Sequence, residues 1–552
     1  MIRIRQCTAG LIGVMTLTAG LGASVARAQQ SGNDDALPAF SPVTAERLIN
    51  SEAEPHNWLM YSGNYSAQRY SGLDQIDRQN VTGLEIAWVH QLQVLDRAET
   101  TPLVVDGVMF ITESPSTVIA VDASSGRPYW RYEYQLPDDM VFCCGRNNRG
   151  VAVQGDTVLM STLDAHLVAL DAKTGTVLWE TEVQQTSSGY SKTAAPLVVG
   201  DTVFTGVAGG EFGIRGVVDA YNLHTGEREW RFYTTPGPDN PDVRSWSGES
   251  WRTGGAATWM TGSYDPELNL VYWGTGNPGP DYDGTVREGD NLYSDSVVAL
   301  DADTGEMKWY FQFTPHDIHD WDSTQIPILA DTTFDGEDRK VMLFPNRNAF
   351  FYVLDRETGE FLLGEPYAKQ TWAEGLDDDG RPILLPGKEP TPEGNIVSPA
   401  IIGGSNWWSP SYSPRTDLLY VMALDGETKY FIRPIAYEEG ESYRAGGGET
   451  PEPMENYHRA VRAISPQTGD LQWEFPVDPR TTSGLMSTAG DLVFGGTADG
   501  YFFALDAVTG EPLWNKNIGG RVHSGPMGYA VGGQQYVAIA AGNAVFSFAL
   551  PE

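Results

Sequence analysis

Two adjacent cysteines, Cys143 and Cys144, are the residues of this chain whose spacing most directly suggests chemistry. Neighbouring Cα atoms lie about 3.8 Å apart across a trans peptide, whereas disulfides usually join Cα atoms about 4.4–6.8 Å apart. A bond between the two sulfurs would therefore close a small strained ring, a rigid plate suited to contact with something flat. Two free thiols that happen to be neighbours are the alternative, and the pair alone does not decide between them.

The N-terminus indicates the compartment. A basic segment precedes an apolar run over residues 11–25, and a small-x-small site follows at 26–28. This is the order of a secretory signal peptide, so we expect residues 1–28 to be cleaved and the mature protein to be periplasmic. An oxidising compartment allows the cysteine pair to form a disulfide. The apolar run is too short for a good membrane span, and no other stretch is long and apolar enough.

The charge balance limits the partners. The chain has 36 basic and 73 acidic residues, a net charge of −37. A basic footprint for nucleic acid is missing, and an anionic membrane surface would be repelled. A basic protein partner or a bound cation is favoured, although a solvated acidic surface explains most of this charge. No Cys-x-x-Cys-His segment is present, so we expect no c-type haem on this chain and a separate electron acceptor if electrons are transferred.

One motif recurs along the chain: a small or apolar residue, an Asp-like residue, Thr/Ser-Gly and a final Trp. Its copies span 120–130, 169–179, 220–230, 299–309, 353–363, 463–473 and 504–514. Each copy predicts a strand, a tight turn in which glycine adopts positive φ, and a second strand ending in a docking aromatic. The fifth copy is degenerate, with Leu363 in place of Trp. The long gap after it is expected to hold two loop insertions, 364–395 and 425–458, one of which could cover the central channel.

The two ends of the chain complete the repeat pattern. A strand ending at Trp88 lacks preceding strands of its own, and the segments 535–541 and 544–550 supply them. The sequence therefore predicts an all-β fold, an eight-bladed β-propeller of four-stranded antiparallel blades whose ring is closed by N- and C-terminal strands. We expect this propeller to form a single domain over residues 29–552.

Six segments, in order, resemble the quinoprotein alcohol dehydrogenases, which use pyrroloquinoline quinone (PQQ). They begin with Cys-Cys-Gly-Arg-Asn-Asn-Arg-Gly at 143–150 and continue at 210–213, 274–280, 314–322, 346–351 and 403–407. The resemblance covers essentially the whole mature chain. It implies a PQQ-dependent oxidation of an alcohol to an aldehyde or ketone, with one metal ion and with electrons passed to a separate acceptor such as a c-type cytochrome.

The resemblance also implies a metal site. Glu211, Asn277 and Asp320 are expected to surround an ion that touches the quinone, and their oxygen ligands suit a hard cation rather than zinc or copper. Asp322 adds a further carboxylate, as in lanthanide-type members of the family, whereas calcium-type members tend to have a small residue there. A lanthanide is therefore favoured, with calcium as the alternative. Asp322 could instead be a turn carboxylate that faces water.

For the cofactor, the resemblance implies a sandwich between Trp259 and the Cys143–Cys144 ring. The residues expected to bind its edges are Glu99, Arg149, Thr193, Gly209, Gly210, Arg347, Asn406 and Trp407. A tryptophan in this chain more often docks blades, but Trp259 lies outside the repeat register. Arg149 could alternatively form a structural ion pair.

For catalysis, the resemblance implies that Asp320 is the general base that removes the hydroxyl proton of the alcohol. The cation would act as a Lewis acid on the quinone, and Arg347 would hydrogen-bond the same quinone oxygen. Two residues depart from the family pattern: His319 stands where Trp is usual, and Thr482 where a large aromatic often lines the site. Both predict a more open or more polar pocket, unless neighbouring loops refill the space.

Two alternatives stay open at this point. A non-catalytic propeller that scaffolds outer-membrane protein assembly would share the docked tryptophans, but would not need the acidic residues and the cysteine pair. A PQQ-dependent sugar or polyol dehydrogenase would share the cofactor site. The sequence names neither the alcohol nor the oligomeric state, and the chain could form a homodimer.

Overall fold

The structure, a computed structural model, describes residues 29–30, 37, 41–138, 140–334, 336–451 and 456–551. The expected signal peptide lies outside these residues. Helix is limited to short elements: α1 (Ala45–Ile49), η1 (Ser51–Ala53), η2 (Val81–Gly83), η3 (Thr186–Ser188), η4 (Gly210–Phe212), η5 (Pro241–Ser245), η6 (Ser250–Thr253) and η7 (Gly284–Val286). In this part of the chain, no helix has the length and apolar character needed to cross a membrane.

Eight sheets of the described chain contain four or more strands, and neighbouring strands run antiparallel except for the pair β2–β33. The first four sheets comprise β4 (Leu103–Val105), β5 (Val108–Glu113), β6 (Thr117–Asp122) and β7 (Pro128–Glu133) with β1 (Gln29–Gln30) at the edge; β8 (Ala152–Gln154), β9 (Thr157–Ser161), β10 (His166–Asp171) and β11 (Val177–Glu182); β12 (Leu197–Val199), β13 (Thr202–Gly206), β14 (Val217–Asn222) and β15 (Arg228–Tyr233); and β16 (Ser263–Asp265), β17 (Leu270–Gly274), β18 (Ser296–Asp301) and β19 (Met307–Gln312).

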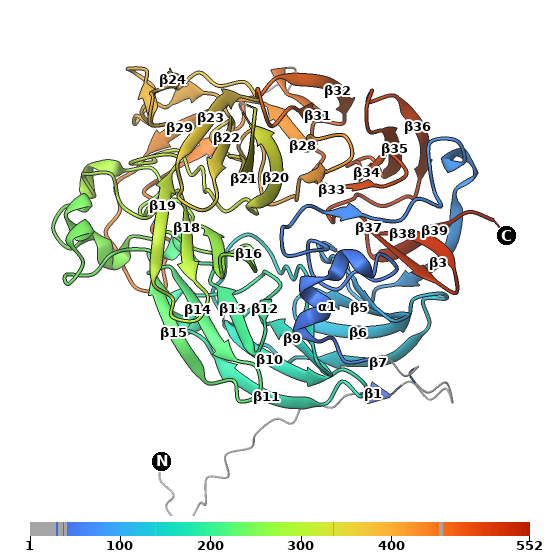
Figure 1. Cartoon of the computed structure of the whole chain (residues 1–552). Helices are drawn as coiled ribbons and strands as arrows, with labels where there is room; N and C mark the ends of the chain where they lie inside the picture. The colour runs from blue at the N-terminus through green and yellow to red at the C-terminus, as the bar shows by residue number, and fades with distance from the viewer. Residues whose placement is uncertain are drawn as a thin grey trace, which may run out of the picture.

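The remaining four sheets comprise β20 (Ile328–Phe334), β21 (Glu337–Pro345), β22 (Phe350–Asp355) and β23 (Phe361–Pro366); β27 (Ser411–Ser413), β28 (Leu418–Asp425), β31 (His458–Ile464) and β32 (Leu471–Val477); β33 (Leu485–Thr488), β34 (Leu492–Gly496), β35 (Tyr501–Asp506) and β36 (Pro512–Asn517) with β2 (Tyr70–Ser71); and β37 (Met527–Val531), β38 (Gln534–Ala541) and β39 (Ala544–Ala549) with β3 (Glu85–Gln91). Figure 1 shows these sheets arranged radially around a common centre. This arrangement is a β-propeller, which confirms the predicted all-β propeller architecture.

The last of these sheets joins the two ends of the chain. β3 pairs antiparallel with β39, and the register places His90 opposite Val545. The C-terminus lies beside β3 in Figure 1. The early strand that contains Trp88 therefore completes a sheet whose other strands, β37, β38 and β39, come from the C-terminal segment.

The recurring Gly and Trp couple one sheet to the next. Trp130 on β7 donates a hydrogen bond from Nε1 to the carbonyl oxygen of Ala172 at 3.0 Å. Its ring covers Gly175, which has φ +70°, and a Cβ at Gly175 would lie only 2.5 Å from that ring. The same pairing joins Trp88 to Gly126, Trp179 to Gly226, Trp230 to Gly305, Trp309 to Gly359 and Trp473 to Gly510. The motif thus requires glycine both for its backbone conformation and for the stacked ring.

The two insertions differ from the predicted loops because they contain small sheets. β24 (Ala373–Leu376) pairs with β25 (Pro382–Leu384), and β29 (Thr428–Ile432) lies between β26 (Asn395–Val397) and β30 (Gly446–Glu449). The glycine run of β30 has little strand propensity of its own, so its pairing with β29 determines its structure. The segment before β30 contacts two earlier loops of the chain. The backbone N–H of Tyr282 donates to the carbonyl oxygen of Arg444 at 3.1 Å, and the backbone N–H of Tyr443 donates to that of Glu211 at 2.7 Å.

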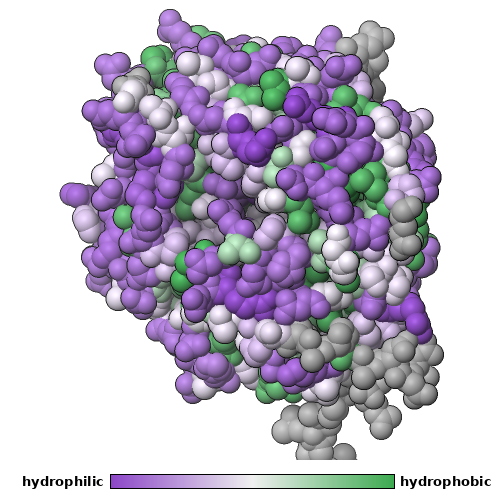
Figure 2. All heavy atoms as spheres, turned by 45° about the vertical axis from the view of Figure 1, so that its right-hand side comes forward, coloured by the Kyte–Doolittle hydropathy of each residue, from purple (hydrophilic) through white to green (hydrophobic). Residues whose placement is uncertain are grey.

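Hydrophobic side chains from the inner strands form the contacts between sheets. The largest buried cluster includes Phe110, Val168 and Phe494, which come from three different sheets. Hydrophilic residues cover most of the face shown in Figure 2. Hydrophilic side chains on this face can therefore be solvated, while the contacts between the sheets are apolar.

Candidate active site

The topology brings the predicted site residues to one end of the propeller. In a four-stranded antiparallel sheet, the second and fourth strands run in the same direction, so the segments that follow them leave the sheet at the same end. Segments that follow a second strand contain Gly209, Gly210, Glu211, Asn277 and Arg347. Segments that follow a fourth strand contain Glu99, Cys143, Cys144, Arg149, Thr193, Trp259, Asp320, Asp322, Asn406 and Trp407. Loops carry the chemistry, and the sheets position them.

Arg347 joins the two predicted catalytic-loop carboxylates. Its Nη1 lies 2.5 Å from Oδ2 of Asp322, and its Nη2 lies 3.5 Å from Oδ1 of Asp320. The guanidinium is itself fixed because Nε and Nη2 both donate to the carbonyl oxygen of Ile401. Asp320 adopts φ +62°, a left-handed conformation that aspartate tolerates better than most residues. The structure therefore places Asp320 beside the positively charged guanidinium of Arg347, which its own hydrogen bonds hold in position.

Asp322 also contacts the predicted ligand Asn277. The backbone N–H of Asn277 donates to Oδ1 of Asp322 at 3.1 Å. Gly276 is required at this point, because a Cβ there would collide with the Asp322 carboxylate. Asp322 is 7 % exposed, so the alternative of a turn carboxylate facing water does not hold.

Burial raises the pKa values of the clustered carboxyl groups. For Asp320, burial is the largest cause and Arg347 opposes it, with a resulting pKa of about 7. Burial likewise raises the pKa values of Glu211 and Asp322, with Arg444 and Arg347 as the main opposing charges. Several carboxylates desolvated together need positive charge nearby. Their oxygen donors fit a hard cation.

A second group of residues surrounds Arg149. Its Nη2 lies 2.9 Å from Oε2 of Glu99, and its Nη1 donates to Oγ1 of Thr193 at 2.5 Å. The guanidinium carbon lies 5.3 Å from the ring centre of Trp259 and 4.6 Å from that of Trp407. Arg149 is thus a buried ion-pair partner that also contacts both tryptophans. A flat polyacid such as PQQ fits these residues, since they combine a cation and hydrogen-bonding groups with aromatic faces.

Two glycines and Asn406 complete the predicted cofactor-binding set. Gly209 has φ +119° and precedes η4, the short helix that carries Glu211. Gly210 leaves space, because its nearest neighbour to an added Cβ would be Ala257 at 3.6 Å. Asn406 accepts a hydrogen bond from the backbone N–H of Trp407 and donates to the carbonyl oxygen of Ile402.

Cys143 and Cys144 form a disulfide and are not two free thiols. Nη2 of Arg444 donates to Sγ of Cys143 at 3.1 Å, and Sγ of Cys144 lies 3.4 Å from Oε1 of Glu211. Cys143 and Trp259 both pack on the apolar cluster that contains Ala257. The disulfide therefore lies next to the carboxyl group of Glu211, and Cys143 shares an apolar cluster with the predicted stacking residue Trp259.

The two departures from the family pattern have different outcomes. The ring of His319 is held in place, because it stacks on Trp321 at 4.3 Å and meets Tyr430 edge-on. Burial lowers its pKa, which favours the neutral imidazole. At Thr482 the surroundings are polar, since Oγ1 lies 2.9 Å from Nδ1 of His523.

Three residues near the acidic group were not predicted. Tyr282 donates from its hydroxyl to Oδ2 of Asp320 at 3.0 Å. Asp281 is fully buried, and Arg444 lies 3.8 Å from it and 3.9 Å from Glu211. Asp281 and Tyr282 directly follow the 274–280 segment, so their position was a usable signal. Arg444 comes from an insertion, and nothing in the sequence linked it to the site.

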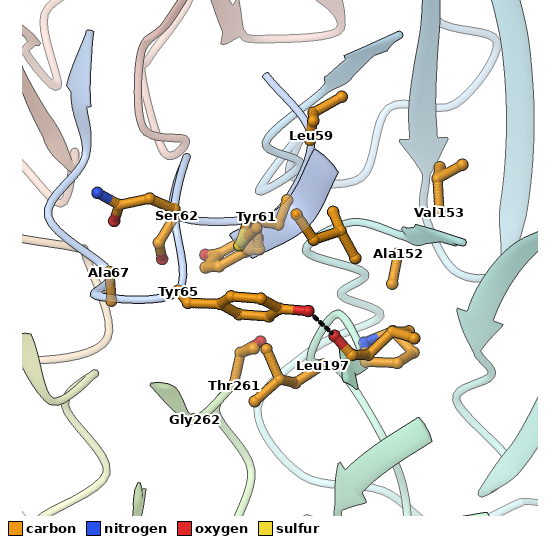
Figure 3. Close-up of a pocket in the computed structure, with 15 residues that line it drawn as sticks. Leu59, Tyr61, Ser62, Tyr65, Ala67, Ala152, Val153, Leu197, Thr261 and Gly262 are labelled. Carbon is orange, nitrogen blue, oxygen red and sulfur yellow. Dashed lines mark hydrogen bonds between the residues drawn. The ribbon is translucent and has the colours of Figure 1, made fainter. Parts of the chain in front are cut away.

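At least two cavities of the described chain are lined by residues outside the predicted site set. The small cavity in Figure 3 is lined by Tyr61, Tyr65 and Thr261, and the Tyr65 hydroxyl donates to the carbonyl oxygen of Val198 at 2.7 Å. None of the residues that line it is a predicted site residue. A second cavity of about 300 Å³ is lined by Tyr282 and His319 among others, so it reaches the group around Asp320.

Comparison with known proteins defines the class. The family described as "Glucose/ethanol/alcohol dehydrogenase, beta-propeller domain" matches residues 58–365 and 461–537. The chain belongs to the PQQ-dependent alcohol dehydrogenase family, and it is an oxidoreductase that acts on alcohols.

Individual relatives are similar over most of their length. Quinoprotein alcohol dehydrogenase PedH of Pseudomonas putida is 39 % identical over 531 residues, which is 91 % of this chain and 89 % of the relative. The putative dehydrogenase XoxF of Paracoccus denitrificans is 36 % identical over 535 residues, 90 % of this chain and 89 % of that protein. A solved structure described as a europium-containing methanol dehydrogenase superposes with a TM-score of 0.85 at 32 % identity and covers 92 % of this chain and 100 % of its own.

Proposed function

We propose that this protein oxidises an alcohol to an aldehyde or ketone with one PQQ and one hard cation bound at a single end of the propeller. The observation that carries the proposal is the presence of two groups at the same end of the propeller. In one, Arg347 and Tyr282 hold Asp320 beside buried carboxylates; in the other, Arg149 is held among Glu99, Trp259 and Trp407. We further propose that residues 29–552 form one domain of eight blades, closed by the β3–β39 pair.

Within this site, each residue has a defined task. Asp320 accepts the hydroxyl proton of the alcohol, and its Oδ2 is oriented by the Tyr282 hydroxyl. Arg347 supplies a fixed positive charge at the reacting end of the cofactor. Glu99, Arg149, Thr193, Gly209, Gly210, Asn406 and Trp407 bind the cofactor edges, with Trp259 on one face and the Cys143–Cys144 disulfide on the other. When bound, PQQ takes up the hydride equivalent of the alcohol, and the cation polarises its carbonyl.

The cation would be held by Glu211, Asn277, Asp320 and Asp322. We favour a lanthanide over calcium, because the buried Asp322 contributes a second carboxylate from the same loop. Arg347 already pairs with that carboxylate, so the cation and the guanidinium would share it.

For the electron acceptor, we propose a separate protein such as a c-type cytochrome, with a basic face that matches the net charge of −37. Export to the periplasm, predicted from residues 1–28, and a homodimeric assembly are part of the same proposal. A PQQ-dependent sugar or polyol dehydrogenase is the alternative, favoured by the polar Thr482–His523 contact.

The experiment compares wild-type protein with Asp320→Asn after reconstitution with PQQ and either lanthanum or calcium. An artificial electron acceptor reports turnover over a panel of primary alcohols, secondary alcohols, sugars and polyols. The wild type should turn over alcohols in preference to sugars, and Asp320→Asn should keep its bound PQQ but lose about 10²–10⁴-fold in turnover. Unchanged turnover in the variant would contradict the role of Asp320, and a preference for sugars would support the alternative.

A further inference from the structure

Asp281 carries a buried carboxylate to which no side chain donates a hydrogen bond of good geometry. The residue is 0 % exposed, and neither Oδ1 nor Oδ2 has a hydrogen-bond partner. Removing a carboxylate from water without a partner is costly, so such a group needs either a proton or a cation.

The neighbours of Asp281 identify the missing partner. Arg444 lies 3.8 Å from Asp281 and 3.9 Å from Glu211. Tyr282, the next residue along the chain, donates to Asp320, and the side chain of Asn277 also lies close to Asp281. Glu211, Asn277 and Asp320 are three of the four residues proposed to bind the cation. A cation held among them would therefore lie near the unpaired oxygens of Asp281 as well.

Arg444 does not fill this role. Its Nε lies 3.8 Å from Oδ2 of Asp281, beyond hydrogen-bond distance, and that Nε also lacks a hydrogen-bond partner. The Arg444 side chain is 42 % exposed, while that of Asp281 is 1 % exposed. A half-exposed guanidinium is a weak counter-charge for a fully desolvated carboxylate.

We propose that Asp281 is an additional carboxylate ligand of the cation, and that it favours a trivalent over a divalent ion. With Asp281, the carboxylates around the ion are Glu211, Asp281, Asp320 and Asp322, against the two guanidinium groups of Arg347 and Arg444. This excess of negative charge stabilises a higher cation charge. The inference rests on the proposed function, because it assumes that the cation binds where Glu211, Asn277 and Asp320 meet.

The test uses PQQ-loaded full-length protein as wild type, Asp281→Asn and the control Asp283→Asn. The control substitution removes the same charge two residues away. In wild type, however, the Asp283 carboxylate already accepts hydrogen bonds from the backbone N–H and the hydroxyl of Thr285. Bound lanthanum and calcium are measured by mass spectrometry after dialysis against chelator-buffered solutions of each metal. Thermal unfolding is followed in parallel with and without metal.

Asp281→Asn should weaken lanthanum binding about 10–100-fold or more and calcium binding less, whereas Asp283→Asn should bind like wild type. Without metal, Asp281→Asn should unfold at the same or a higher temperature than wild type, because an unpaired buried charge is gone; the stabilisation by lanthanum should shrink. Equal lanthanum binding by wild type and Asp281→Asn would overturn the inference.

Other outcomes are also decisive. A metal-free Asp281→Asn protein that is less stable than wild type, or no longer folds, would give Asp281 a structural role and overturn its assignment as a ligand. Wild-type protein that retains PQQ but binds neither metal would contradict the proposed cation site itself, and the inference with it. The wild-type measurement thus separates failure of the proposed function from failure of this inference.

Discussion

Arg347 and Asp322 are joined by a buried ion pair, with Nη1 of Arg347 2.5 Å from Oδ2 of Asp322. The same guanidinium lies 3.5 Å from Asp320. Arg347 is therefore shared by the proposed base, Asp320, and by Asp322, the carboxylate proposed to select the metal. Removing either partner of a buried pair leaves a charge without compensation. This arrangement makes the acidic loop sensitive to the charge of any metal that binds beside it.

Asp322→Ala tests the preference for a lanthanide. The variant loses one carboxylate ligand and frees Arg347, so turnover supported by lanthanum should fall about 10–100-fold or more. Turnover supported by calcium should fall less, since a divalent ion depends less on the added charge. Dye-linked turnover is measured with each metal over a range of concentrations. Equal activity with calcium in both wild type and variant, without any lanthanum effect, would show that the lanthanide preference is wrong.

Tyr282→Phe tests the orientation of the proposed base. The Tyr282 hydroxyl donates to Asp320, which stabilises the carboxylate and lowers its pKa, whereas burial raises that pKa to about 7. Loss of the donor should raise the pKa, and a general base works only when deprotonated. The acidic limb of the kcat/KM profile should therefore move to higher pH by up to about one pH unit.

The Tyr282→Phe profile is compared with that of Tyr443→Phe. Tyr443 lies in the 425–458 insertion, and no contact between it and Asp320 is found among the described residues. Identical pH profiles for Tyr282→Phe and wild type would show that the Tyr282 hydroxyl does not affect the pKa of Asp320. A shift of the limb to lower pH would have the wrong sign and would contradict it as well.

Replacing both Cys143 and Cys144 by serine should affect the cofactor more than the fold. A bond between neighbouring residues closes almost no loop, so it constrains the unfolded chain very little. The thermal unfolding temperature should change by only a few degrees, while PQQ dissociates faster. Absorption spectroscopy after gel filtration measures the retained PQQ. Protein that melts far earlier, yet holds PQQ as tightly as wild type until it melts, would assign the disulfide to stability alone.

Gly175→Ala tests the coupling between sheets. Its φ is +70° and Trp130 covers it, so the variant combines backbone strain with a displaced ring and should lose about 2–4 kcal/mol of stability. Gly200→Ala is the matched control: its φ is +57°, but nothing lies within 4 Å of the added Cβ. That control should lose only about 1 kcal/mol. Equal losses in denaturant unfolding would show that the stacked tryptophan contributes nothing.

The repeats made the fold predictable because each Gly-Trp copy encodes a local turn and a contact with the next sheet. Trp88 and the C-terminal strands could be paired from the sequence, since each lacked what the other supplied. β30 could not be predicted as a strand, because Gly446, Gly447 and Gly448 have no side chains to show an alternating pattern, and β29 alone gives them a partner.

The site was predictable where a recognisable segment carried the residue, as at Asp320 and Arg149. Arg444 and His319 show the limits. Arg444 reaches Cys143 across a sequence separation of 301 residues, which no local pattern encodes. For His319, residue size alone suggested an open pocket, but its ring stacks on Trp321 and its Nε2 contacts the carbonyl oxygen of Lys388. The second contact comes from an insertion, which no local pattern links to His319.

The most direct test of the central claim is the absorption spectrum and metal content of full-length protein reconstituted with PQQ and lanthanum. We expect bound quinone and bound lanthanum in equal amounts, and we expect the quinone absorption to bleach or shift when an alcohol is added. The Glu211→Gln variant should bind less lanthanum under the same conditions. Protein that binds no quinone, or whose quinone spectrum does not respond to any alcohol with either lanthanum or calcium present, would contradict the account.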